Sequence, residues 1–196
     1  DWAANPTTLS GDINTLNDHT DNSDHILIGA AGAMVDGFTV ERGGDQHFNL
    51  AQDGVISAFG AGLYVAEAGA DAMRLANCTF RYNNVYYDDG TTRSNTGYGG
   101  AVFADGLTND VELLNCIAWG DEAWRRFRDE LDTTDELFGD SIVVRYTDIA
   151  GGWSGAGGNN LDADPRFGVD GTGDAFTGTW TAAPTWDATK GQTTFT

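Results

Sequence analysis

Residues 75–84 read LANCTFRYNN, and residues 113–122 read LLNCIAWGDE. Each stretch places an asparagine and a cysteine after two apolar residues and ends in polar residues. The same local pattern recurs twice more along the chain. The four segments that align without gaps are AMVDGFTVERGG (33–44), MRLANCTFRYNN (73–84), VELLNCIAWGDE (111–122) and IVVRYTDIAGGW (142–153).

The apolar positions of each segment come in two pairs with a spacing of two, which is the period of a β-strand. An odd step separates the pairs and indicates a corner or bulge. A second, weaker repeat, GAGLYVAE (60–67) and GGAVFADG (99–106), lies between these segments. The repeats predict an all-β parallel β-helix, a solenoid whose stacked units bury one continuous core. The predicted core rows are Phe38, Cys78, Cys116 and Thr147, followed by Val40, Phe80, Ala118 and Ile149.

Cys78 and Cys116 are the only cysteines and occupy the same position of the repeat. Stacked strands lie about 4.8 Å apart, so distance alone permits a disulfide. Disulfide geometry is demanding, however, and neighbouring side chains on parallel strands point the same way. Buried free thiols are therefore expected, with a disulfide as the alternative. Metal binding is not expected, because no histidine or further cysteine shares their register.

Residues 121–140 interrupt the repeat. Trp124, Phe127 and Leu131 recur at helical spacing, and arginines stand among acidic neighbours. This pattern predicts a short amphipathic helix near 121–138 that packs on the flank of the solenoid and covers the core. A helix that binds a partner is the alternative interpretation.

Several short words of the sequence resemble a known family. GGAV (99–102) and FRYN (80–83) match the GGA[ILV] and FxxN tetrapeptides of polymorphic outer-membrane protein repeats. LSGDI, VDGFTVERGG, NCTFRYN, NCIAWGD, YTDIAGG and NNLDADPRF follow the order seen in secreted bacterial right-handed parallel β-helix proteins. The resemblance covers about residues 6–167. It implies a right-handed β-helix that is exported and extracellular or displayed on the cell surface. The same fold also carries polysaccharide enzymes, so fold alone does not assign function.

The chain departs from this family in three places. Ala118 stands where a large apolar residue is usual, residues 121–140 are an unusual insertion, and the tail after Phe167 alternates Thr and Trp. We therefore expect a β-helix domain over 1–167, with 1–13 as its N-terminal cap or first strand. Residues 168–196 are expected to be a linker or the start of a strand-rich module. The first residues show no signal peptide, so the chain is expected to be processed or part of a longer polypeptide.

Composition limits the partners. The 196 residues include 24 Asp and 6 Glu against 9 Arg and one Lys, giving a net charge of −20. Such a surface repels nucleic acid and anionic membranes, and no apolar run has the length of a membrane span. The aspartates fit either turns or calcium-binding loops. The calcium candidates are Asp88, Asp89, Asp162, Asp164, Asp170 and Asp174.

The expected outward positions offer little for catalysis. Thr39, Thr79, Ile117 and Asp148 supply one carboxylate, whereas a glycoside hydrolase needs two that face each other across a sugar. The expected function is therefore a non-catalytic extracellular or cell-surface module for structural display, self-assembly or adhesion. Its expected partners are neighbouring subunits, a continuing polypeptide or glycans. The alternative is a polysaccharide lyase or glycoside hydrolase fragment.

Overall fold

A computed structural model describes residues 7–15, 21–45, 49–50, 56–65, 71–85, 94–105, 111–123, 125–127, 130–132, 136–165, 185–187 and 192–194. The chain divides into two compact units, residues 1–165 and 166–196. In the second unit, β23 (Thr185–Asp187) and β24 (Gln192–Thr194) form an antiparallel pair.

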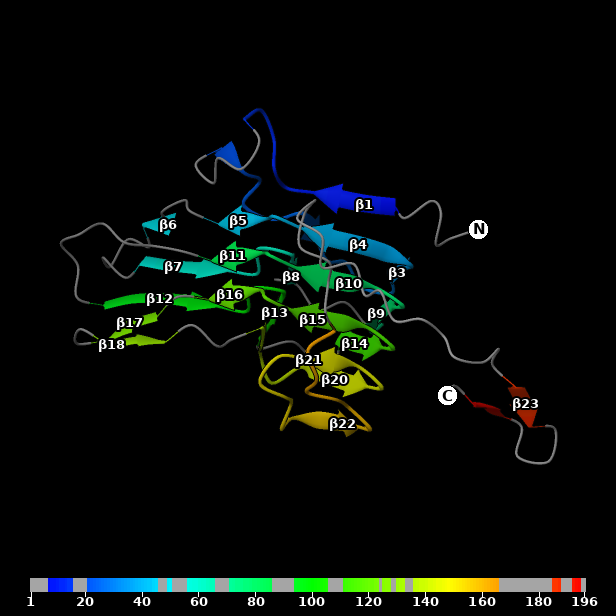
Figure 1. Ribbon diagram of the computed structural model, residues 1–196. Coiled ribbons are helices and arrows are strands. Elements are labelled where there is room, and N and C mark those ends of the chain that lie inside the picture. Colours follow the sequence, from blue (N-terminus) through cyan, green and yellow to red (C-terminus); the bar gives the residue numbers. More distant parts are fainter. Residues whose placement is uncertain are drawn as a thin grey trace. The chain divides into compact units, whose positions relative to one another are not determined.

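Parallel sheets make up most of the first unit (Figure 1). The β4 sheet contains, in order, β1 (Thr7–Ser10), β4 (Phe38–Glu41), β10 (Thr79–Arg81), β15 (Ile117–Trp119) and β21 (Asp148–Ile149). The β9 sheet contains β3 (Met34–Asp36), β9 (Met73–Ala76), β14 (Val111–Leu114), β20 (Ile142–Arg145) and β22 (Ala156–Gly158). The β8 sheet contains β2 (Leu27–Ile28), β8 (Leu63–Val65), β13 (Val102–Ala104) and β19 (Leu137–Phe138), and the β11 sheet contains β5 (Gly44–Asp45), β11 (Asn84–Val85) and β16 (Glu122–Ala123). The predicted all-β class is confirmed.

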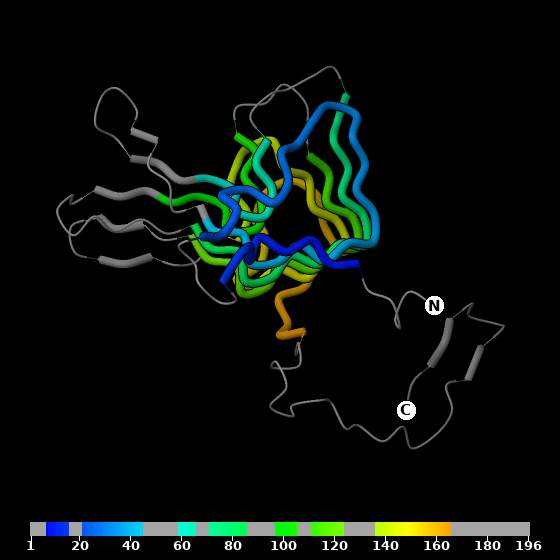
Figure 2. The backbone as a smooth tube through the Cα atoms, turned by 90° about the horizontal axis from the view of Figure 1, so that it is seen from above, coloured from blue at the N-terminus to red at the C-terminus, as the bar shows by residue number. Residues whose placement is uncertain are grey.

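Three times in succession the chain places strands in the β8, β9, β4 and β11 sheets in that order. We call each such series a pass. The described residues of a fourth pass add β19, β20 and β21 to the first three of these sheets, and β22 begins a fifth pass. Seen from above, the described passes lie over one another (Figure 2). The repeat of 38–40 residues between the first three passes is therefore the length of one pass.

Register between passes aligns the apolar positions of the sequence repeat. Phe80 pairs with Val40 on one side and with Ala118 on the other, and Ala118 pairs with Ile149. All four side chains are buried. The small Ala118 beside the large Phe80 keeps the row evenly filled. These residues lie within one core with Leu63, Leu75, Val102, Leu113 and Val144.

Two corners flank the β4 sheet on every pass, and each has a residue with positive φ. The first corner separates the β9 and β4 sheets, and the second separates the β4 and β11 sheets. First-corner residues are Gly37, Asn77, Asn115, Tyr146 and Asn159, with φ from 52° to 77°. Second-corner residues are Arg42, Tyr82, Gly120 and Gly151, with φ from 58° to 79°. The first corner is the odd step in the sequence repeat, and Asn occurs there because its short polar side chain tolerates left-handed backbone.

The predicted helix near 121–138 is wrong. The described residues of this segment form β16, β17 (Arg125–Phe127), β18 (Glu130–Asp132) and β19. β17 and β18 make an antiparallel hairpin at the edge of a sheet that also contains β12 (Ser94–Tyr98), β7 (Ile56–Phe59) and β6 (Asn49–Leu50). The backbone of β17 pairs with both β12 and β18, and the register places Arg125 opposite Asp132. Pairing with a strand already in place outweighs helix periodicity in a segment this short.

Phe80→Ala tests the central row. Phe80 is fully buried, so its truncation leaves a cavity, and we expect the free energy of unfolding to fall by about 3–5 kcal/mol. The measurement is urea unfolding followed by fluorescence and circular dichroism. Thr8→Ala on the exposed face of the edge strand β1 is the control and should change stability by less than about 0.5 kcal/mol. A Phe80→Ala protein as stable as this control would contradict the assigned core.

Candidate functional site

The first corner explains why cysteine and threonine are buried beside an apolar core. The residue after each positive-φ position on the first four passes has a backbone N–H that faces a side chain of the following pass. The backbone of Phe38 faces the Cys78 thiol and that of Cys78 faces the Cys116 thiol, and each favours the thiolate form of the sulfur that it faces. The N–H of Cys116 donates to Thr147 Oγ1 (3.2 Å), and that of Thr147 donates to Asn160 Oδ1 (3.1 Å). The third and fourth passes thus satisfy a buried donor through the side chain of the next pass.

Three of these side chains, those of Cys78, Cys116 and Asn160, also contact a carbonyl of the preceding pass as donors, whereas Thr147 Oγ1 donates to Arg145 in its own pass (3.0 Å). Cys78 Sγ lies 3.6 Å from the oxygen of Val35, and Cys116 Sγ lies 3.6 Å from that of Leu75. Asn160 Nδ2 lies 3.0 Å from the oxygen of Val144. In each case the carbonyl belongs to the residue three before the N–H that is accepted. We call a side chain with this pair of contacts a corner cap. The predicted row of Phe38, Cys78, Cys116 and Thr147 lies in register, with Phe38 partly buried and the other three buried.

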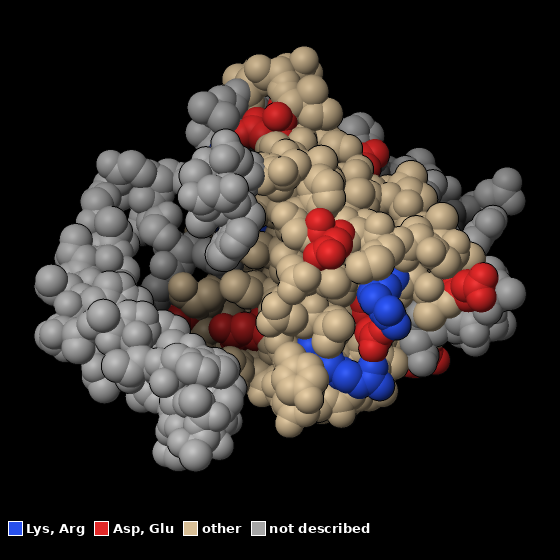
Figure 3. Space-filling view, turned by 90° about the vertical axis from the view of Figure 1, so that its right-hand side faces the viewer, with Lys and Arg blue, Asp and Glu red and all other residues tan. Residues whose placement is uncertain are grey.

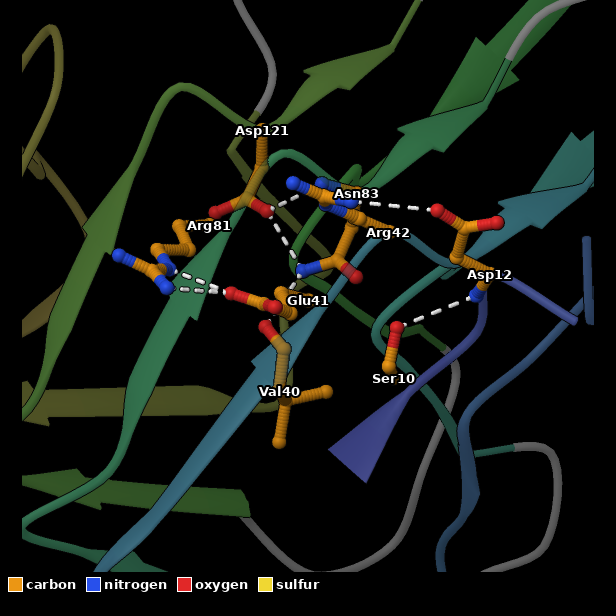
Figure 4. Close-up of polar contacts among 8 residues, drawn as sticks. All are labelled: Ser10, Asp12, Val40, Glu41, Arg42, Arg81, Asn83 and Asp121. Atoms are coloured by element: carbon orange, nitrogen blue, oxygen red, sulfur yellow. Dashed lines mark hydrogen bonds and ion pairs between the residues drawn. The ribbon is translucent and has the colours of Figure 1, made fainter. Parts of the chain in front are cut away.

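Corner caps recur at the second corner with stronger polar groups (Figure 4). Asn83 accepts the N–H of Gly43 (2.9 Å) and donates to the oxygen of Val40 (3.0 Å). Asp121 Oδ1 accepts both the N–H of Asn83 (2.8 Å) and its side-chain amide (2.6 Å). Both residues are at most 2% exposed.

Glu136 takes over the capping role on the third pass. The fourth pass has Gly152 at this position, which offers no side chain. Glu136, from the segment just before β19, accepts the N–H groups of Gly120 (3.0 Å) and Asp121 (3.1 Å) with its two carboxyl oxygens. An acidic residue from elsewhere in the chain thus completes the ladder.

Asp121 and Glu136 form a buried carboxyl pair. Burial raises the pKa of Asp121 to about 7, although hydrogen bonds from Asn83 oppose the shift. Burial also raises the pKa of Glu136, and the charge of Asp121 adds to the increase. Asp121 Oδ2 is buried without a hydrogen-bond partner. The two carboxyls are coupled, so burial favours a pair that retains a proton.

A groove of about 970 Å³ follows the first corner across the passes. One wall is a ladder in which Asn77 donates to Asp36 (2.7 Å) and Asn115 donates to Asn77 (2.7 Å). The β4 sheet contributes the outward row Thr39, Thr79, Ile117 and Asp148, which the register aligns. The Tyr146 residue lines the same groove and is 59% exposed. Cys78 and Cys116 lie at its inner side.

Charged groups form ion pairs outside the groove. Glu112 on β14 accepts from Arg74 on β9 (2.8 Å) and from Arg145 on β20. Figure 3, which faces the right-hand side of Figure 1, shows basic and acidic groups meeting in one mixed cluster, with several separate acidic groups elsewhere on this face. The Arg81–Glu41 and Arg42–Asp12 pairs lie near the second corner (Figure 4). Such partly exposed pairs contribute little stability individually, but they neutralise charge between passes.

The predicted calcium ligands are not brought together in the described part of the chain. Asp162 and Asp164 are exposed after the fifth-pass corner, and Asp162 Oδ1 accepts the N–H of Gly151 (3.2 Å). Asp88, Asp89, Asp170 and Asp174 lie outside the described residues. Among the described residues, no three His, Cys, Asp or Glu side chains cluster as a metal site would require.

Sequence reasoning missed the buried roles of Asn83, Asp121 and Glu136. It treated Asn83 and Asp121 only as polar residues that end a repeat, whereas both side chains are buried. A usable signal was present in Gly120-Asp121, as in Asn77-Cys78, where a residue type that tolerates positive φ precedes the buried residue. Tyr82 before Asn83 gave no such signal. Glu136 had no such signal, because it reaches the ladder from outside the repeat.

Comparisons with family models, with curated proteins and with solved structures find no match to this chain. Within the described part of the chain, no helix has the length and apolar character of a membrane span. Function is therefore inferred from the geometry of the groove and its corner ladder.

Asp121→Asn should stabilise the protein above neutral pH. The new amide supplies a donor where Asp121 Oδ2 has none and removes a buried charge, which should add about 1–3 kcal/mol at pH 8. The native pKa of Asp121 lies above its unfolded value near 3.8, so wild-type stability falls as pH rises from about 4 to 7. The advantage of the variant should grow over that window and then level off. Chemical unfolding at pH 4, 6 and 8 measures it.

Glu136→Gln is the matched opposite change. Both Glu136 oxygens accept backbone N–H groups, and a Gln amide would turn an N–H donor toward one of them. We expect a loss of about 1–3 kcal/mol. A gain from Glu136→Gln together with a loss from Asp121→Asn would refute this account of the carboxyl pair.

Proposed function

We propose that the passes are turns of a right-handed parallel β-helix, and that the chain is a non-catalytic extracellular or cell-surface module for adhesion to glycans. The parallel register of the sheets and the repeated corners support the helical architecture. The groove along the first corner is the single observation that supports glycan binding. It runs across successive passes, as an extended polymer requires, and polar side chains line it at each step.

The chemistry of the groove favours a neutral polysaccharide. Its lining combines amide, hydroxyl and carboxylate groups, which exchange hydrogen bonds with sugar hydroxyls, and one exposed aromatic residue, Tyr146. Its described charged residues are Asp36 and Asp148, and the whole chain carries a net charge of −20. An acidic polymer would be repelled by this field. Neutral sugars carry no such penalty.

Hydrogen bonding within the chain supports a binding role for the two carboxylates. Asp36 accepts from Asn77 (2.7 Å), and Asp148 Oδ1 accepts the N–H of Ala163 (3.0 Å). Carboxylates held in this way can orient sugar hydroxyls.

Tyr146→Asn tests the groove with little effect on folding. Asn occupies this positive-φ position on the second and third passes, so the backbone should be retained. We expect affinity for neutral polysaccharides, measured by affinity electrophoresis and isothermal titration calorimetry, to fall at least about tenfold, because a stacking residue is lost.

Tyr82→Asn is the control, because Tyr82 has nearly the same φ, is 44% exposed and lies at the second corner outside the groove. Its affinity should match that of the wild type. Equal losses in the two variants, or binding of uronic-acid polymers in preference to neutral ones, would contradict the proposed site.

A further inference from the structure

The groove and the corner ladders do not explain why two of the buried corner residues are thiols. Cys78 and Cys116 are 1% and 3% exposed, are free, and stand at the same corner of consecutive passes. Both contribute to the lining of the groove, which gives small solutes a route toward them. Capping alone does not require sulfur, because Thr147 and Asn160 cap the next passes with oxygen.

The register brings the two residues side by side. Thr79 pairs with Ile117, and the N–H of Ile117 donates to the oxygen of Cys78 (2.9 Å), so the preceding residues are direct neighbours. Adjacent strands lie about 4.8 Å apart, inside the range of Cα separations that disulfides span. The Cβ atoms of neighbouring parallel strands are farther apart than a relaxed disulfide prefers, so the two corners must draw slightly together when the bond forms.

The surroundings give the two sulfurs different chemistry. The Cys116 side chain and the backbone of Phe38 and Gly37 face the Cys78 sulfur and favour its thiolate. These donors lower the pKa of Cys78 to about 7 against the opposing effect of burial. The same contact and burial raise the pKa of Cys116. Cys78 is thus the nucleophile of the pair, and Cys116 holds the proton beside it.

We propose that Cys78 and Cys116 form an oxidisable dithiol, a modification site at which a hydroperoxide links the second pass to the third. The Cys78 thiolate attacks one oxygen of the peroxide, forming a sulfenic acid as the O–O bond breaks and hydroxide leaves. The sulfur of Cys116 then attacks the sulfenic sulfur, the S–O bond breaks, and the Cys116 proton leaves with the hydroxyl group as water. The proton released when Cys78 ionises joins the departing hydroxide. Two thiols lose two electrons in total, and with hydrogen peroxide as the oxidant one peroxide becomes two waters.

Oxidation preserves most of the corner contacts. A disulfide sulfur still accepts a hydrogen bond, so the N–H groups of Phe38 and Cys78 keep their partners. The S–H contacts to Val35 and Leu75 are lost. In exchange, the bond closes a covalent ring over residues 78–116, one complete circuit of the chain. The restricted unfolded state makes the oxidised form more stable.

The test treats the reduced full chain with one equivalent of hydrogen peroxide. We expect both thiols to disappear together, the intact mass to fall by about 2 Da, and peptide mapping to show a Cys78–Cys116 link within one chain. The melting temperature should rise by about 5–10 °C and return on reduction with dithiothreitol. The oxidation rate should increase with pH around a midpoint near 7.

Single-cysteine variants identify the nucleophile. In Cys116→Ser, Cys78 should stop at the sulfenic acid and be trapped by dimedone, whereas Cys78→Ser should react at least about tenfold more slowly. Serine keeps an acceptor at the corner, as Thr147 does in the same row, and circular dichroism checks the fold. Two thiols that survive excess peroxide, equal reactivity of the two variants, or disulfides only between chains would each overturn the proposal.

Discussion

A backbone N–H that turns toward the core at each corner is the constraint on which this structure depends. A left-handed residue changes the direction of the chain between sheets, and the next N–H then has no strand partner. Left alone in an apolar interior, that group would destabilise the fold by as much as a lost hydrogen bond. The following pass supplies one acceptor group at each corner, and this group is a sulfur, a hydroxyl, an amide or a carboxyl. Apolar packing determines how closely the passes approach, and the caps determine where each pass turns.

The same constraint connects the interior to the groove. Asn77 and Asn115 hold the left-handed backbone that turns Cys78 and Cys116 inward, and their side chains form the polar wall outside. Each corner thus has an inner cap and an outer ladder built from adjacent residues. A substitution of an inner cap should therefore disturb the adjacent residue of the outer ladder, and the reverse. The residues that line the groove are thus constrained by the packing of the core.

Spacing in the sequence was sufficient to predict the stacked strands and the alignment of Val40, Phe80, Ala118 and Ile149, because strand period and repeat length reinforce each other over four segments. It failed for residues 121–140, where three apolar residues at helical spacing were outweighed by an existing strand edge at β12. It also failed for Asn83 and Asp121, because polarity alone argues for the surface, and only the preceding left-handed residue shows that the next N–H needs a buried acceptor. Glu136 lies outside any repeat and could be found only in three dimensions.

Each cap comes from the pass that follows, and this gives the stack a direction. When such a chain emerges from the N-terminus onward, the newest circuit always has corner donors that await a segment still to arrive. During vectorial folding, the most recently formed circuit would then always have unpaired corner N–H groups. Each added circuit would supply the acceptors for the circuit before it. A cut between circuits leaves unsatisfied N–H donors on the N-terminal side of the break, whereas the C-terminal side keeps its own caps and loses strand pairing and the groups that its side chains capped. Shortening this protein from its two ends should therefore have unequal consequences.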